Sequence, residues 1–185
     1  LFKSPTLNRV LGQWLCASPV LADCEAYGAS HRIHHRTAGT QGDPDLPNYQ
    51  SYPVSKARFG RKLRRDITGQ TGIKLLLGTL TGRGKTITQR DGEQNSALSQ
   101  GLLVNGLLFA VLWLAGYPAL YLLWVLAYLT VYPLFARIRQ VAEHGAVTDL
   151  YDRDPRLHTR TTLVRWYERA FLSPNYVNFH LEHHL

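Results

Sequence analysis

Apolar and polar residues are distributed unevenly along the chain, with one long apolar block between two charged flanks. From Gln94 to Ala136 the chain contains no Asp, Glu, Lys, Arg or His. A helix on the surface of a soluble protein carries a polar face, and this block offers none. The pattern therefore predicts helices that are apolar on all sides, as in membrane spans.

The apolar block is interrupted once, near its middle, by the helix-breaking sequence Gly116-Tyr117-Pro118. One bilayer crossing takes roughly 20 apolar residues, so the block has room for two. We predict a transmembrane hairpin over residues 98–136, with one span from Leu98 to Ala115 and the other from Ala119 to Phe135. Because the turn is short and uncharged, both flanks of the hairpin lie on one side of the membrane. The expected fold class is all-α, an integral membrane protein with histidine-bearing helices in the cytosol.

Shorter segments complete the predicted organisation. An apolar stretch from Leu11 to Ala22 predicts the end of a helix that enters or leaves the membrane. The segment from Ile73 to Leu80 is too short to cross and predicts a re-entrant or interfacial helix, while Asp43 to Pro47 predicts a loop. The glycine-rich segment from Thr81 to Thr86 does not match the spacing of a phosphate-binding loop.

Positive charge is concentrated beside the apolar block and helps to orient it. Of the 185 residues, 21 are Lys or Arg and 13 are Asp or Glu, which gives a net charge of +8. Cations near the block are Lys56, Arg58, Arg61, Lys62, Arg64 and Arg65 before it and Arg137 and Arg139 after it. Cytoplasmic flanks carry such an excess, so we expect these flanks in the cytoplasm. The same cations could also receive an acidic electron-carrier protein or anionic headgroups; nucleic acid is not an expected partner.

Overall composition excludes several other classes of protein. With 45% hydrophobic and 18% charged residues, the chain is neither disordered nor collagen-like. Cys16 and Cys24 are too few for a disulfide scaffold, and we expect both to be reduced thiols. The length fits a single domain over residues 1–185.

Six of the eight histidines fall into two copies of the motif H-x-x-H-H. The first copy contains His31, His34 and His35, and the second contains His180, His183 and His184. On a helix, positions i, i+3 and i+4 share a face, so each copy could aim three imidazoles at a common point. Neutral imidazole is a ligand for Fe, Zn and Cu, and six exceed the needs of one tetrahedral zinc. The count suggests two metal ions.

The remaining histidines are open to more than one interpretation. If the second span continues as a helix, the eight residues after Ala136 carry His144 about 12 Å beyond the membrane edge, where it could join the cluster or stay hydrated. His158 lies in a charged stretch and is expected to be a surface or packed histidine without metal. For Glu182 we favour a hydrogen bond that orients an imidazole; Glu143 is left open.

One metal-dependent class is excluded by the sequence, and a second fits it poorly. Zinc proteolysis needs H-E-x-x-H or H-x-x-E-H, and neither string occurs. A metal transporter needs ionisable groups within its spans, whereas this hairpin offers only Asn105, Thr130 and some Tyr hydroxyls.

Taken together, the order of these motifs resembles the membrane fatty acid desaturase family, within the histidine-box di-iron superfamily. The resemblance covers essentially the whole chain and is carried by H-x-x-H-H, the apolar hairpin, and the second H-x-x-H-H in its context from Asn178 to Leu185. The segments Thr40–Asp45 and Ala142–His144 resemble parts of bacterial members. Members also carry an earlier paired-histidine box, H-x-x-x-H or H-x-x-x-x-H, which this sequence lacks. We therefore expect the sequence to begin just downstream of that box, to lack two ligands and to load metal incompletely.

The resemblance implies a catalytic di-iron centre and a lipid substrate. Its metal ligands would be His31, His34, His35, His180, His183 and His184, together with His144. Two Fe ions would use O₂ and two electrons from a ferredoxin-like or cytochrome-type donor to introduce a double bond into an acyl chain. The expected location is a bacterial inner membrane, with the histidine boxes on the cytoplasmic side. A di-iron hydroxylase or ketolase acting on lipid, alkane or carotenoid fits the same boxes, and a non-catalytic membrane metal-binding protein is an alternative of another class.

Overall fold

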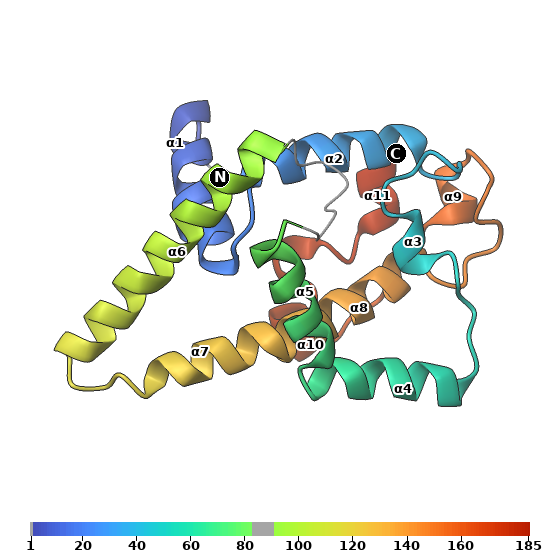
Figure 1. Ribbon diagram of the computed structural model, residues 1–185. Coiled ribbons are helices and arrows are strands. Elements are labelled where there is room, and N and C mark those ends of the chain that lie inside the picture. The colour runs from blue at the N-terminus through green and yellow to red at the C-terminus, as the bar shows by residue number, and fades with distance from the viewer. Residues whose placement is uncertain (1, 83–90) are drawn as a thin grey trace. The chain divides into compact units, whose positions relative to one another are not determined.

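The computed structural model describes residues 2–82 and 91–185, and Arg83 to Thr86 of the glycine-rich segment lie outside these ranges. Within the described residues every regular element is a helix, which confirms the all-α prediction (Figure 1). The chain divides into two compact units, Leu1–His31 with Thr68–Val131 and Arg32–Ile67 with Tyr132–Leu185. The helices are α1 (Pro5–Leu11), α2 (Cys24–Thr37), α3 (Leu46–Tyr49), α4 (Lys56–Ile67), α5 (Gln70–Leu80), α6 (Asp91–Leu114), α7 (Leu120–Leu129), α8 (Val131–His144), α9 (Pro155–His158), α10 (Trp166–Phe171) and α11 (His180–His184), with short helical turns at Gly12–Ala17, Ser18–Val20 and Pro174–Tyr176.

The first unit contains the turn of the predicted hairpin and the helices on either side of it. Helices α6 and α7 are joined by a tight turn, as Figure 1 shows. Gly116 in this turn has a φ of +84°, a left-handed conformation that glycine adopts without strain. The backbone N–H of Tyr117 donates to the carbonyl of Leu112 at 2.8 Å, which closes the end of α6. The turn is therefore at the position that the breaker residues predicted.

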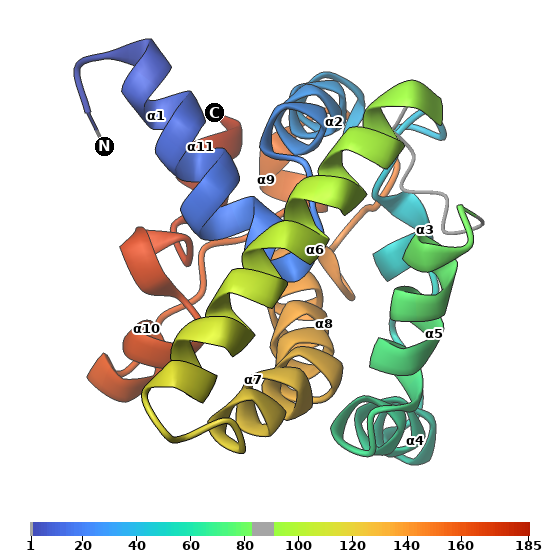
Figure 2. The same cartoon turned by 60° about the vertical axis from the view of Figure 1, so that its left-hand side comes forward.

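One amide side chain ties three parts of this unit together. Asn105 in α6 donates to the carbonyl of Pro19 at 3.1 Å, and its Oδ1 accepts from the Tyr121 hydroxyl and the Trp124 indole, each at 3.1 Å. Figure 2 shows α6 alongside the segment that follows α1. All of these polar atoms are thereby paired in apolar surroundings, where unpaired ones would be costly.

Two glycines allow helices to approach closely in the same unit. A Cβ at Gly72 in α5 would lie 2.1 Å from the carbonyl oxygen of Leu129, and one at Gly101 would lie 2.6 Å from the Leu21 side chain. Small residues at such contacts let backbones pack directly against each other. Helix α5 occupies the segment for which a short helix was predicted and begins at Gln70.

Two helical segments are long and apolar enough to cross a membrane, Ser96–Leu114 and Leu120–His144. Only 11% and 6% of the residues in their apolar windows are buried. A core helix of a soluble protein would be mostly buried, so this exposure is more typical of membrane spans than of such core helices. The second segment is longer than predicted because α8 follows α7 almost directly and ends at His144.

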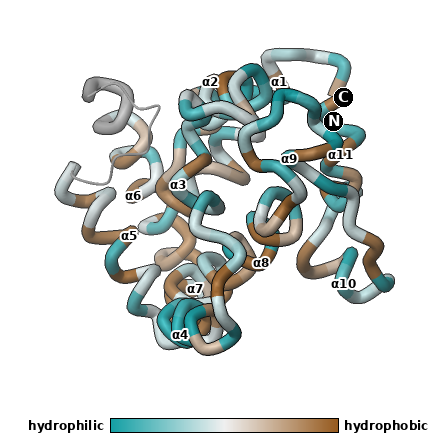
Figure 3. Tube along the Cα trace, turned by 90° about the vertical axis from the view of Figure 1, so that its right-hand side faces the viewer, coloured by the Kyte–Doolittle hydropathy of each residue, from teal (hydrophilic) through white to brown (hydrophobic). Residues whose placement is uncertain are grey.

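The second unit packs its helices around aromatic side chains. Leu46, Tyr49 and Tyr52 form its buried core, with Phe59 and Val141 packed against them. Helix α4 is strongly hydrophilic, as the teal tube of Figure 3 shows. Its last turn is nevertheless fixed, because the fully buried Asp66 accepts hydrogen bonds from Arg137 in α8, one of them at 3.0 Å.

The two cations that follow the hairpin, Arg137 and Arg139, are each paired with a carboxylate. Arg137 is bound to Asp66, and Arg139 lies 2.9 Å from the carboxylate of Glu143. Both guanidinium groups are therefore paired within the second unit. The exposed cations of this unit that were predicted to face the cytoplasm are carried mainly by α4, namely Lys56, Arg58, Arg61, Arg64 and Arg65.

Candidate metal centre

Four histidines from three helices converge in the second unit. His34 comes from α2, His144 from the end of α8, and His180 and His184 from α11. Their ligand atoms all lie within 4.8 Å of one another. The side chains of the first three are almost inaccessible, with 2%, 4% and 6% of their residue surface exposed. We call these four residues the buried histidine group.

The Nε2 atoms of this group face each other at short distances. His34 and His144 are 3.2 Å apart, His144 and His180 are 2.8 Å apart, and His180 and His184 are 3.2 Å apart. The same nitrogen of each ring therefore points to the middle of the group. Convergent nitrogens of this kind are the donor set of a first-row metal ion.

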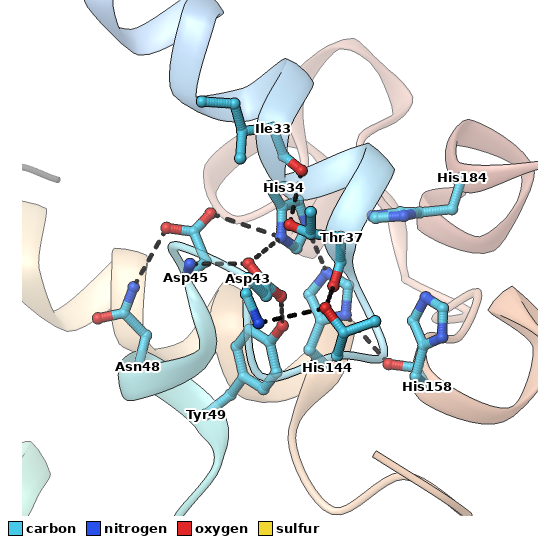
Figure 4. Close-up of polar contacts among 12 residues, drawn as sticks. Ile33, His34, Thr37, Asp43, Asp45, Asn48, Tyr49, His144, His158 and His184 are labelled. Carbon is cyan, nitrogen blue, oxygen red and sulfur yellow. Dashed lines mark hydrogen bonds and ion pairs between the residues drawn. The ribbon is translucent and has the colours of Figure 1, made fainter. Parts of the chain in front are cut away.

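The opposite nitrogens of two rings are held by oxygen atoms (Figure 4). His144 Nδ1 lies 3.1 Å from the backbone carbonyl of His158 and His34 Nδ1 lies 2.8 Å from a carboxylate oxygen of Asp43. A carbonyl oxygen accepts only, so His144 carries its proton on Nδ1 and leaves Nε2 with a lone pair. The second nitrogen of a metal-bound histidine is held in this way in known sites.

Asp43 is itself fixed as an ionised acceptor. Burial alone would raise the pKa of its carboxyl group, but hydrogen bonds from His34 and Tyr49 outweigh burial and hold that pKa below its ordinary value. The Tyr49 hydroxyl donates to the other carboxylate oxygen, and burial together with this hydrogen bond raises the pKa of Tyr49, so the hydroxyl keeps its proton. The ionised carboxylate makes His34 Nδ1 the donor, so the neutral form of His34 presents the lone pair of Nε2.

When both rings are neutral, the Nε2 lone pairs of His34 and His144 face each other across 3.2 Å. Two acceptors at this distance repel each other. A cation between them would turn the repulsion into two bonds, because neutral imidazole is the metal-binding form. The residues present therefore fit a metal ion.

A second pair of histidines lies beside the buried group. His35 Nε2 and His183 Nε2 are 2.9 Å apart, and the ring of His35 stacks on that of His184 with centroids 4.2 Å apart. Burial lowers the pKa of His35, and the neighbouring His183 lowers it further. Burial also lowers the pKa of His184, and repulsion from His144 and His180 adds to this effect. Both rings are thus biased toward the neutral form that binds metal.

His31 precedes His35 by one turn of α2 and belongs to the first unit. Its ring stacks on Tyr27, with centroids 5.6 Å apart. The structure thus places six of the seven proposed ligands together in the second unit, and His31 on the same helix as two of them.

The two boxes do not each form a separate centre, as the expectation of three rings aimed at one point had implied. His34 faces the buried group, whereas His35 faces His183. Consecutive residues on a helix diverge by about 100°, because a turn takes 3.6 residues. Each box therefore shares its rings between the two sets.

Several supporting residues were not singled out as functional from the sequence. Asp43 falls in the segment from Asp43 to Pro47 that was predicted as a loop, and the end of that segment belongs instead to α3, which carries Tyr49. The sequence could have indicated them only by their closeness to the first histidine motif, since Asp43 follows His35 by eight residues. Of the two glutamates, Glu182 accepts a hydrogen bond from the Thr161 hydroxyl, and Glu143 is paired with Arg139.

Comparison with known proteins agrees with this geometry. The family model described as fatty acid desaturase matches residues 1–185. The chain belongs to the fatty acid desaturase family. The resemblance inferred from the histidine boxes is thereby confirmed.

One similar member of the desaturase family is dihydrorhizobitoxine desaturase from Bradyrhizobium elkanii, which is 30% identical over 201 residues. The match covers all of this chain and 55% of the relative, so the chain spans about half the length of that protein. No solved structure was found to match this chain.

Proposed function

We propose that this protein is a membrane di-iron desaturase that uses O₂ to introduce a double bond into the acyl chain of a lipid. The observation that carries the proposal is the convergence of imidazole nitrogens from α2, α8 and α11 within 4.8 Å of one another. Membership of the fatty acid desaturase family supports the same chemistry.

Iron would be held by His34, His144, His180 and His184 in one set, and by His31, His35 and His183 in the other. When bound, an iron pair supplies the oxidising power that removal of hydrogen from an unactivated carbon requires. The protein's own contribution is orientation. Asp43 and the carbonyl of His158 fix which nitrogen of His34 and His144 carries the proton, and burial of the rings keeps water out.

The proposal includes a membrane location. The exposed apolar surfaces of α6 and α7 would face lipid, with the turn at Gly116 on the far side. By the positive-inside rule, the cations of α4 favour the cytoplasmic side for the histidines. In a bacterium this corresponds to the inner membrane, where an acyl substrate partitions and an electron donor in the cytoplasm has access.

The proposed partners are an acyl lipid and a reduced donor of the ferredoxin or cytochrome type. The exposed cations of α4 suit an acidic donor protein. Their positive charge would also attract anionic lipid headgroups. Iron as the metal and O₂ as the co-substrate complete the proposal.

Product analysis in membranes tests this function. The protein is expressed from its complete gene in a bacterium, and the lipids are profiled with and without O₂. We expect a new double bond that depends on O₂ and on a reductant, and its loss in His183→Ala. Ser99→Ala is a matched control, because its hydroxyl donates only within α6.

The products separate the alternatives. A hydroxylated or ketone product would overturn desaturation in favour of a sister activity on the same boxes. Metal binding without oxygen consumption or product would instead indicate a non-catalytic metal-binding protein. Because the relative is named for dihydrorhizobitoxine, that compound is a second substrate to supply, and conversion of it alone would contradict an acyl lipid substrate.

A further inference from the structure

His158 at the end of α9 is as deeply buried as the proposed ligands. Only 3% of its surface is exposed. Its Nδ1 lies 2.8 Å from the backbone carbonyl of Asp152, which can only accept a hydrogen bond. A neutral His158 therefore carries its proton on Nδ1 and presents the lone pair of Nε2.

That lone pair has no hydrogen-bond partner among the residues that the structure describes, although the atom is fully buried. A buried acceptor without a partner is costly, and such atoms in native proteins call for a donor or a cation. The sequence had suggested a packed or surface histidine without metal, and a packed one would be expected to have both nitrogens satisfied. The unpaired Nε2 does not fit that interpretation.

The ring of His158 lies beside two members of the buried histidine group, as Figure 4 shows. The ring centroid of His158 is 6.4 Å from that of His144, and the two rings are nearly parallel. The ring centroid of His184 lies 6.0 Å away. Two imidazoles on one ion with metal–nitrogen bonds of ~2.1 Å have centroids at most about 6.5 Å apart. Each of the two distances falls within that limit, and the 6.4 Å separation requires the rings of His158 and His144 on nearly opposite sides of the ion.

The backbone around His158 is built for a close approach. Gly39, just after α2, has a φ of +76°, and a Cβ there would lie 2.0 Å from the carbonyl oxygen of Asp152 and 2.9 Å from His158 Nδ1. Only glycine fits at this position without moving the hydrogen bond that orients the ring. The segment after the first histidine box and the loop that carries His158 are therefore packed directly together.

We propose that His158 is a further metal ligand of the buried histidine group, which it joins through Nε2. This inference rests on the proposed function in that it requires a metal ion in the group. It predicts one more imidazole on that ion than the boxes and His144 provide.

Metal binding of purified protein, expressed from its complete gene and held in detergent, tests the inference. Co(II) serves as the probe, because its visible absorption reports the number and type of its ligands. We expect His158→Ala to weaken Co(II) binding by 10- to 100-fold, on the order seen when residues around a metal site are removed, and to change the absorption spectrum. His158→Gly leaves a cavity of imidazole size, and added imidazole should restore both affinity and spectrum.

Thr159→Ala is the matched control, since Thr159 is equally buried and its hydroxyl donates to the carbonyl of Glu143. We expect this variant to bind Co(II) with the parent's affinity and spectrum. Unchanged binding in His158→Ala, with binding lost in His180→Ala, would overturn the role of His158 and leave the proposed function intact. Weakened binding that imidazole does not restore, shared with Thr159→Ala, would show a structural role only. Absence of metal binding in the parent protein would overturn both proposals.

Discussion

At the scale of single residues, metal affinity depends on the atoms that hold the far side of each ring. Asp43 receives the Nδ1 proton of His34 at 2.8 Å. Replacing Asp43 with Asn would offer His34 a weaker, uncharged partner. We expect Asp43→Asn to lower iron affinity by 10- to 100-fold, the range found for such supporting residues.

Iron titration of the purified variant measures this loss. Asp45→Asn is the control, because the carboxylate of Asp45 is 3.9 Å from His34 Nδ1, beyond hydrogen-bond distance. Equal loss in both variants would mean that overall negative charge matters here and that the specific contact does not.

Asp43 also links stability to pH. Its pKa is lower in the folded protein than its ordinary value of 3.8, so the carboxylate stabilises the fold fully above that value. The contribution is lost as the pH falls through the lower folded value. Asp43→Asn should therefore have a lower Tm than the parent at pH 7, with the difference shrinking below pH 3.8. A Tm difference that grows on acidification would contradict this linkage.

Much of the residue-scale picture followed from spacing, and part of it did not. The two H-x-x-H-H motifs predicted a cluster because i, i+3 and i+4 share a helix face. The division of each motif between two sets could not be predicted, since it depends on where α8 ends. Likewise, nothing in the charged sequence around His158 indicates that its Nε2 is buried.

At the scale of helices, the hairpin is held together by the hydrogen bonds that one polar side chain donates and accepts. Asn105 pairs with Pro19, Tyr121 and Trp124, and replacement by Leu of similar size would leave the last two donors unpaired. We expect Asn105→Leu to destabilise the protein by about 1–3 kcal/mol, the cost of buried groups left without partners. Metal content at low temperature should be unchanged.

Thermal unfolding in detergent measures this effect. Leu103→Ala is the control, because Leu103 is an exposed residue of α6. A Tm of Asn105→Leu equal to that of the parent would show that the hydrogen bonds contribute no net stability. The sequence predicted the helices and the turn from apolar length and breakers, but the partners of Asn105 follow from packing between segments that are far apart in the chain.

At the scale of the whole molecule, the account requires a membrane with the histidines on the cytoplasmic side. Tyr117 in the hairpin turn and Arg61 on α4 are both exposed and would then lie on opposite sides. In a background with Cys16 and Cys24 replaced by Ser, Tyr117→Cys should react with an impermeant thiol reagent in intact spheroplasts. Arg61→Cys should react only after lysis. Reaction of both in intact spheroplasts, or of Arg61→Cys alone, would contradict the topology.

The most direct measurement of the central claim is the iron content of the protein purified from membranes after expression of its complete gene. The account predicts about two irons per chain, coupled as a pair, and nitrogen-dominated coordination in X-ray absorption. His34→Ala and His183→Ala should each lower the content, since they belong to different sets. Well-folded protein that binds no iron, or that binds iron equally well without these two imidazoles, would contradict the account.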